Sequence, residues 1–298
     1  MAPTSSSRPH EDVDTVLAEG IRYERGGVTA RAVASFEEVI ARADEHPAAA
    51  AEAWWRLANQ HRLQSRWNDA LQAAHAGAEF ARAHGLRDQE ADALNIEGAI
   101  WMTRGDYAQA RVLFERMLAL GVASGTRGKA LQNLGSIAAE ERRYEDAERY
   151  FLASRIEYAA AGDTRGEAIT LTNLGRLQMD RGDLDVARAT LEDAITEARQ
   201  ANDLELHAIA LLNLGMVHGE RHSLEEAEER ITTAYGQFTI ADNAVQRVRC
   251  LIELARMAAK RGDTAASRTC LLHARTVATQ AELPREITAI DERLRAFD

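Results

Sequence analysis

The chain contains little cysteine and no long apolar run, and both absences exclude classes of protein. Two cysteines, Cys250 and Cys270, stand among 298 residues. They are too few for a disulfide framework and lack the spacing of metal ligands, so we interpret them as free thiols of a reducing compartment. No stretch of about 18 apolar residues is present to cross a membrane, and residues 1–10 lack the apolar segment of a signal peptide. We therefore expect a cytoplasmic protein.

Proline is also scarce, and its placement favours helix. The four prolines are Pro3, Pro9, Pro47 and Pro284. Because proline breaks helices, nothing between Pro47 and Pro284 prevents helix formation. Alanine, leucine, glutamate and arginine dominate this stretch and favour helix, and alternating runs of strand-forming residues are absent. The sequence predicts an all-α protein.

Positive charge is in deficit as well. The chain carries 36 Lys and Arg residues against 47 Asp and Glu residues, a net charge of −11. Nucleic acids and anionic membranes both attract proteins with basic faces. The charge balance therefore argues against nucleic acid or a membrane as the partner.

A short motif recurs at a fixed spacing. Leu131–Gly135 reads LQNLG, Leu171–Gly175 reads LTNLG and Leu211–Gly215 reads LLNLG, each 40 residues after the last. Every copy is followed by a turn and then by an alanine. Self-similarity of this kind predicts a repeat architecture, in which each unit packs on its neighbours.

This pattern resembles the tetratricopeptide repeat, a helix–turn–helix unit with the spacing W-x₂-L-G-x₂-Y…A-x₃-F. With the motif glycine as the eighth position, the frame extends to seven units. We expect small residues at positions eight and twenty, where the two helices of a unit cross, and an apolar plug at position twenty-four, absent only at Ala74. Position eight holds Gly20, Ala58, Gly98, Gly135, Gly175, Gly215 and Ala255, position twenty holds Ala32, Ala70, Ala110, Ala147, Ala187, Ala227 and Ser267, and position twenty-four holds Phe36, Ala74, Phe114, Phe151, Leu191, Ile231 and Leu271.

The resemblance implies a right-handed α-solenoid superhelix of about seven helix–turn–helix units over residues 13–280. Beyond Pro284, Ile287, Ile290 and Leu294 recur at helical spacing, which predicts a capping helix over residues 284–297 that covers the last unit. Residues 1–12 are expected to form a disordered tail.

Polar residues mark the starts of several second helices. Asp106, Asp183 and Asp263 follow turns, where an aspartate side chain accepts hydrogen bonds from backbone N–H groups of the first helical turn. Ser223 and Glu226 have the spacing of a capping box. We expect helix N-caps at these four sites.

The resemblance also predicts which residues line the concave groove of the solenoid. In this family the second, fifth, sixth, ninth, twelfth and thirteenth positions of each unit face that groove. The candidate peptide-binding residues at these positions are Trp55, Arg56, Asn59, Arg62, Asn95, Lys129, Gln132, Asn133, Asn173, Arg176, Asn213, Arg249 and Arg256.

Three asparagines, Asn133, Asn173 and Asn213, take the sixth position in consecutive units. An amide side chain offers a donor and an acceptor, so it can pair with both the N–H and the C=O of one peptide unit. Related peptide-binding members use groove asparagines in this way, and the resemblance implies the same here. The alternative is that these asparagines bond neighbouring helices and stiffen the array.

An exposed tryptophan and several cations complete the predicted groove. Trp55 takes the fifth position, where an exposed tryptophan is a plausible binding anchor, although it is equally open to a packing role. The groove arginines and lysines gather positive charge in an acidic protein, which favours a partner with acidic side chains or a free carboxylate.

Catalytic patterns are weak by comparison. Residues 125–130 only approximate a phosphate-binding loop, and no nucleophile elbow occurs. His218 and His222 lie four apart, but one takes a packing position and the other a turn, so we interpret both as structural. We expect no enzymatic activity, no metal and no cofactor.

The sequence thus predicts a non-catalytic scaffold or adaptor that binds a peptide or protein segment in its groove. A second hypothesis is a ligand- or peptide-responsive regulator of bacterial signalling, a role that longer-period repeats of this kind fulfil. Self-association through an exposed repeat face is a further open possibility.

Overall fold

The computed structural model describes residues 12–297, and these are almost entirely helical, with no strand among them. The tail expected over residues 1–12 lies outside the described residues except for Asp12. The helices are α1 (Val13–Arg25), α2 (Thr29–Ile40), α3 (Pro47–Leu63), α4 (Trp67–Ala83), α5 (Arg87–Thr103), α6 (Tyr107–Ala119), α7 (Ser124–Glu140), α8 (Tyr144–Ala161), α9 (Thr164–Arg181), α10 (Leu184–Gln200), α11 (Leu204–Glu220), α12 (Leu224–Ile240), α13 (Ala244–Lys260), α14 (Thr264–Gln280), α15 (Pro284–Leu294) and the 3₁₀ helix η1 (Arg295–Phe297).

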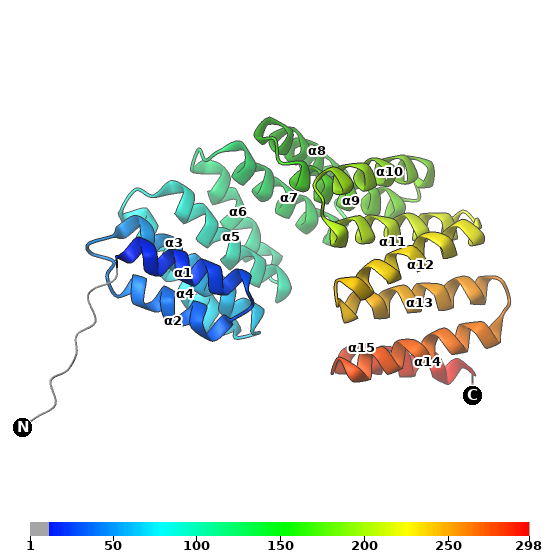
Figure 1. Cartoon of the computed structure of the whole chain (residues 1–298). Coiled ribbons are helices and arrows are strands. Elements are labelled where there is room, and N and C mark those ends of the chain that lie inside the picture. Colours follow the sequence, from blue (N-terminus) through cyan, green and yellow to red (C-terminus); the bar gives the residue numbers. More distant parts are fainter. Residues whose placement is uncertain (1–11, 298) are drawn as a thin grey trace, which may run out of the picture. The chain divides into compact units, whose positions relative to one another are not determined.

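The helices pair as predicted in α1/α2, α3/α4, α5/α6, α9/α10, α11/α12 and α13/α14, with α7 and α8 following α6 in the sequence and α15 at the end. They fall into two compact units, residues 1–137 and 138–298. In the first unit α1 to α6 pack in chain order, and in the second α8 to α15 do the same. Figure 1 shows the hairpins of the second unit, α9/α10, α11/α12 and α13/α14, as antiparallel pairs. The all-α solenoid prediction is confirmed.

Small residues at position eight let the two helices of a hairpin touch, as predicted. A Cβ added at Gly175 would lie 2.6 Å from Leu191 Cγ, and one added at Gly215 would lie 2.6 Å from Ile231 Cγ1. Real Cβ atoms do not approach other atoms so closely, so the plug at position twenty-four occupies the space that the glycine leaves. The same pairing occurs at Gly20 with Phe36 and at Gly98 with Phe114.

The second hairpin satisfies this constraint differently. Its position eight is Ala58 and its position twenty-four is Ala74, and both are fully buried. The extra methyl group at position eight therefore faces the smallest plug of the seven. The small plug Ala74 is thus compensated by Ala58, which is larger than the glycine found at most other crossings.

Most turns contain one residue in the left-handed region, and the residue is not always glycine. Gly105, Gly182 and Gly262 have positive φ in three hairpin turns, whereas Arg142 and His222 take φ of 58° and 61° in two others. Left-handed backbone costs a non-glycine residue roughly 1–2 kcal/mol. The tight three-residue turn is therefore imposed by helix packing where the sequence lacks glycine.

The N-cap predictions are half right. Asp106 Oδ1 accepts from the backbone N–H of Gln109 at 3.1 Å, and Asp263 Oδ1 accepts from that of Ala266 at 2.8 Å. Asp183 and Ser223 stand at the N-cap positions of α10 and α12, but their side chains make no capping hydrogen bond. The Asp183 carboxylate instead pairs with Arg181 Nε at 3.0 Å.

The predicted capping helix is α15. Ile290 is fully buried, and Ile287 and Leu294 pack beside it against buried residues of α13 and α14. The short 3₁₀ helix after α15 brings Phe297 onto the same cluster. An apolar face of the last hairpin is thereby covered, as the spacing of the three apolar residues predicts.

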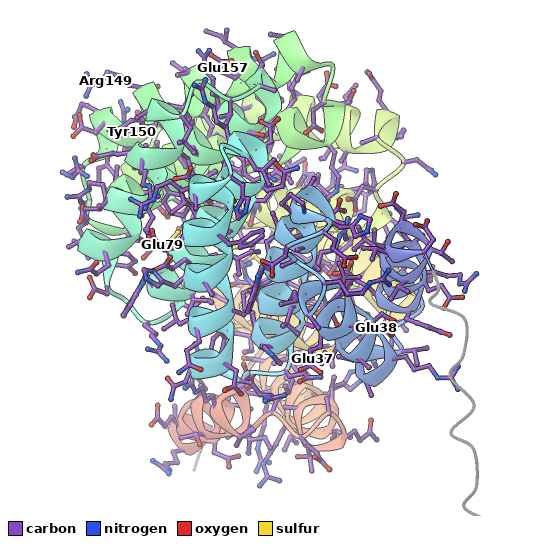
Figure 2. The ribbon with its side chains drawn as sticks, turned by 90° about the vertical axis from the view of Figure 1, so that its left-hand side faces the viewer. Glu37, Glu38, Glu79, Arg149, Tyr150 and Glu157 are labelled. Carbon is purple, nitrogen blue, oxygen red and sulfur yellow. The ribbon has the colours of Figure 1, made fainter. Side chains whose placement is uncertain are left out.

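Charged side chains cover the outer surfaces of the hairpins. Glu37 and Glu38, both exposed, stand out from α2 in Figure 2. Among the described residues, no helix combines the length and the apolar character that a membrane span requires.

The crossing of α9 and α10 gives a stability prediction. Gly175→Ala places a methyl group against Leu191, which is fully buried and has no room to move, so we expect a loss of about 1–3 kcal/mol from overpacking. Gly236→Ala is the matched control, because nothing lies within 4 Å of a Cβ added there. It should stabilise α12 by up to about 1 kcal/mol through helix propensity. Urea denaturation followed by circular dichroism measures both, and a stabilising Gly175→Ala would contradict the proposed crossing.

Candidate functional site

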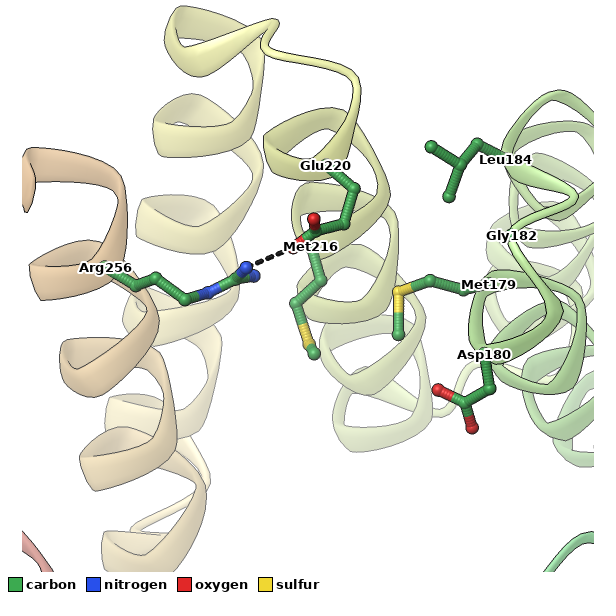
Figure 3. A pocket seen from close by; sticks show the side chains of 7 residues that line it. All are labelled: Met179, Asp180, Gly182, Leu184, Met216, Glu220 and Arg256. Atoms are coloured by element: carbon green, nitrogen blue, oxygen red, sulfur yellow. Dashed lines mark hydrogen bonds and ion pairs between the residues drawn. The ribbon is translucent and has the colours of Figure 1, made fainter. Parts of the chain in front are cut away.

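In the second unit, the first helices of successive hairpins, α9 and α11, line two hollows with residues at groove positions of the repeat. The first, which we call the methionine hollow, has a volume of about 480 Å³ and lies at the C-terminal ends of α9 and α11 beside α13. Figure 3 shows the Met179 and Met216 side chains projecting into it from facing helices, with Leu184 on the same side as Met179. Its lining residues are Met179, Asp180, Gly182, Leu184, Met216, Glu220 and Arg256.

The second, the isoleucine hollow, lies toward the N-terminal ends of α9 and α11 and has a volume of about 270 Å³. Ile169 and Ile209 supply apolar wall, and the amide of Asn173 lies beside them. Arg165 Nε donates to Asp203 Oδ2 at 2.7 Å across its mouth. The lining residues are Arg165, Ile169, Thr172, Asn173, Asp203, Glu205, Leu206 and Ile209.

A carboxylate organises the cations of the methionine hollow. Glu220 pairs with Arg256, the contact drawn in Figure 3, and with Lys260 Nζ at 3.3 Å. Hydrogen bonds from Arg256 and Lys260 lower the pKa of the Glu220 carboxyl, against the opposing effect of burial. Lys260 also donates to the backbone oxygen of Gly219 at 2.9 Å. These cations are therefore held by the protein itself.

The other predicted groove cations have partners too. Arg56 Nη1 lies 2.6 Å from Glu24 and its Nη2 lies 2.9 Å from Glu52. Arg176 Nη2 lies 3.4 Å from Glu140, and Lys129 Nζ lies 3.8 Å from Asp92. Arg56, Arg176 and Lys129 are thus paired with carboxylates of the preceding hairpin and, for Glu52, of the same helix, so the groove is less positive than the sequence suggests.

The repeat frame of the sequence already places these carboxylates at groove positions. Glu52 and Asp92 stand at position two, and Glu140 and Glu220 at position thirteen, all groove positions of the repeat. Counting only the cations of the groove made it look basic. Met179 and Met216 also stand at groove positions, twelve and nine, so the frame likewise indicates apolar side chains in the groove.

The three asparagines have different surroundings. Asn133 Nδ2 donates to Asn95 Oδ1 at 3.0 Å and so bridges α7 and α5. Asn213 is 3% exposed, and its Oδ1 is buried without a partner. Asn173 is half-buried, forms no side-chain hydrogen bond to another described residue, and lines the isoleucine hollow. Of the three, Asn173 is the one that lines one of the two hollows.

Trp55 is half-buried, and the Arg56 guanidinium lies over its ring at 4.4 Å from the centroid. Asn59 Oδ1 accepts from Arg62 Nη2 at 2.8 Å, and half-buried Gln132 lies one turn before Ser136 on α7. Arg249 Nη2 approaches Met216 Sδ at 3.9 Å. As binding residues, all of these remain predictions.

Histidine, cysteine and carboxylate groups do not gather into a metal site anywhere in residues 12–297. Cys250 is buried, and burial raises the pKa of its thiol to about 12. A thiol with so high a pKa is a poor nucleophile at neutral pH.

Comparison with known proteins supports the repeat frame. No protein-family model matches the chain. The regulatory protein AfsR of Streptomyces griseus is 31% identical over 126 residues, which are 41% of this chain and 13% of that protein. Among solved structures, the apo form of the quorum sensor NprR from B. thuringiensis superposes with a TM-score of 0.74, at 14% identity, covering 89% of this chain and 76% of that one.

A Rap protein complexed with Competence and Sporulation Factor superposes with a TM-score of 0.67, at 16% identity, covering 94% of this chain and 80% of that one. The solved structures similar to this chain include tetratricopeptide-repeat proteins. The chain has the tetratricopeptide-repeat fold. Its hairpins, glycine crossings and capping helix are therefore those of a tetratricopeptide-repeat array.

The asparagine environments give a second prediction. Asn133→Ala removes the hydrogen bond that links α7 to α5, so it should lower the free energy of unfolding by about 1 kcal/mol. Asn173→Ala removes no such bond and should leave stability unchanged within about 0.5 kcal/mol. Thermal and urea denaturation of the two variants test this difference. Equal losses would show that the asparagines form one structural ladder.

Proposed function

We propose that the second unit binds a peptide or protein segment along the first helices α9, α11 and α13, and does so without catalysis. The observation that carries this proposal is the pair of hollows on one face of α9 and α11. Between and within them lie two methionine side chains and the amide of Asn173. Methionine adapts its shape to apolar side chains, and an amide pairs with a peptide backbone.

The ion pairs bear on the chemistry of the ligand. Because Glu220 holds Arg256 and Lys260, an acidic ligand would have to compete with an existing carboxylate. We therefore propose that an apolar side chain in the methionine hollow supplies most of the affinity, while backbone bonding to Asn173 orients the segment. The acidic character expected from the sequence becomes a secondary preference.

The similar proteins favour a regulatory setting for this binding. One is a quorum sensor, one was solved with Competence and Sporulation Factor bound, and one is a regulatory protein. We propose that this chain is a cytoplasmic binding module of a regulator or adaptor, with a protein or peptide as its partner. A ligand-responsive sensor differs from a passive adaptor in changing its hydrodynamic radius when the ligand binds.

A peptide selection tests the proposal directly. Peptides are selected from a random library on the wild-type protein, and their affinity is measured by fluorescence anisotropy. Met216→Ala empties part of the methionine hollow, and Asn173→Ala removes the backbone partner, so each should weaken binding about tenfold. Thr276→Ala is the control, since its side chain lies exposed on α14 and bonds only the oxygen of Leu272.

Circular dichroism confirms that each variant remains folded. If the selected peptides bind both groove variants as tightly as the wild type, the segment binds elsewhere and the proposal is wrong. A loss in the groove variants together with an unchanged control supports it.

The ion pair of the methionine hollow gives a charge-dependent prediction. Glu220→Gln removes the carboxylate that Arg256 and Lys260 share, although Arg256 Nε keeps its contact with Glu253 Oε2 at 2.7 Å. The hollow gains one unit of positive charge, so acidic peptides should bind more tightly to this variant, by roughly threefold to tenfold at low salt. Peptides without charge should bind equally to both proteins. Anisotropy titrations at two salt concentrations measure these affinities. An acidic peptide that binds both proteins equally would show that it does not reach this hollow.

The same carboxylate predicts an acid limit to stability. The pKa of Glu220 is lowered in the folded state from about 4.5, so its contribution is present above that value and is lost as the pH falls through the folded pKa. Glu220→Gln should therefore lose less stability than the wild type between about pH 5 and pH 3. Urea midpoints measured across this range test the prediction. Equal losses of stability in the two proteins as the pH falls would contradict it.

A further inference from the structure

A third hollow lies on the other side of α11 and has a different chemistry. Its volume is about 400 Å³, and α10, α11 and α12 line it. We call it the outer hollow, because it shares no lining residue with the methionine and isoleucine hollows. The lining residues are Arg188, Glu192, Ile195, Arg199, His207, Leu211, Leu214, His218, Arg230 and Thr233.

Helix periodicity explains why α11 serves both sides. His207, Leu211, Leu214 and His218 follow one another at steps of four, three and four residues, so they share one face of the helix. Met216 lies two residues before His218 and therefore points to the opposite side. A ligand in the outer hollow does not occupy the groove.

The outer hollow concentrates positive charge in a protein of net charge −11. It contains three arginines and two histidines against a single carboxylate, that of Glu192, which already pairs with Arg188 at 2.7 Å. Arg199 is exposed and forms no ion pair with any described residue. The Arg230 guanidinium has only a distant contact, 3.7 Å to Glu229.

Two buried nitrogens at this hollow lack a partner within the described part of the chain. They are Arg230 Nε and His207 Nε2. Arg230 Nε always carries a hydrogen, and a buried N–H without an acceptor costs about 1–3 kcal/mol, so a ligand that supplied an acceptor there would gain affinity. His207 Nδ1 lies 2.9 Å from Gln237 Oε1. Since that oxygen only accepts, Nδ1 is the nitrogen that donates to it.

His218 lies among charges of both signs, and burial is the main cause of its lowered pKa. Burial lowers the pKa of His218, Glu226 and Glu192 oppose this shift, and Arg230 and Arg188 add to it. A nearby anion would offset the two arginines and raise that pKa. The floor between the histidines is apolar, formed by Leu211 and Leu214 with Ile195 at the side.

We propose that the outer hollow binds a small molecule that carries a phosphate group and an apolar portion. The guanidinium groups of Arg230 and Arg199 hold the phosphate oxygens, because planar guanidinium groups match the geometry of phosphate. The apolar portion lies on Leu211 and Leu214. A volume of about 400 Å³ exceeds what a bare phosphate fills and suits a ligand of small-molecule size. Because Arg199 belongs to α10 and Arg230 to α12, one ligand ties the second helices of successive hairpins together.

Isothermal titration calorimetry with two probes, inorganic phosphate and phenyl phosphate, tests this site at about pH 7, where phosphate monoesters are largely dianionic. Sodium chloride at equal ionic strength is the blank. We expect phenyl phosphate to bind more tightly than inorganic phosphate. Arg230→Gln and Arg199→Gln should each weaken phenyl phosphate binding about tenfold. Arg199 is exposed, so its variant tests the site without endangering the fold.

Arg268→Gln is the charge-matched control, because Arg268 is exposed on α14 and lies outside the hollow. Proton NMR of the histidine rings adds a local readout, in which phenyl phosphate should raise the pKa of His218 in the wild type and not in Arg230→Gln. No binding to wild type, or equal weakening by the control variant, overturns the proposal. Equal affinity for the two probes overturns its apolar half. If Met216→Ala binds phenyl phosphate as tightly as the wild type, the outer hollow is independent of the groove.

Discussion

The hairpins built around Gly20, Gly98, Gly175 and Gly215 depend on the contact between positions eight and twenty-four. Where position eight is glycine, the ring or branched side chain of the plug lies where a Cβ would stand, as at Gly98 with Phe114 and Gly175 with Leu191. This contact sets the distance between the two helices of a unit. It thereby fixes which side of each first helix remains uncovered, and the uncovered sides of α9 and α11 hold the candidate groove.

Ion pairs between successive repeats then determine the electrostatics of that groove. Arg176 and Arg256 at position nine each meet a glutamate at position thirteen of the preceding unit, Glu140 and Glu220 respectively. The two pairs have the same separation of 36 residues. Partly exposed pairs contribute little stability, so the main effect of these two is to neutralise positive charge at the groove positions.

The two sides of α11 separate two kinds of chemistry on one helix. Its groove side presents Met216 beside apolar and amide groups, whereas its outer side presents His207 and His218 among arginines. A helix packed between α10 and α12 is contacted from both sides, so ligands on either side act on the same packed element.

The sequence by itself determined the helical class, the hairpins, the crossing residues and the capping helix. These follow from local spacing and side-chain size, which act between residues a few turns apart. Tertiary structure decided the rest. Neighbouring side chains and their rotamers decide the partner of each groove cation. They also decide the hydrogen bond from Asn133 to Asn95 and the stacking of Arg56 on Trp55. The outer hollow likewise arises only when α10, α11 and α12 pack together, because its cations come from three helices whose contacts no single repeat encodes.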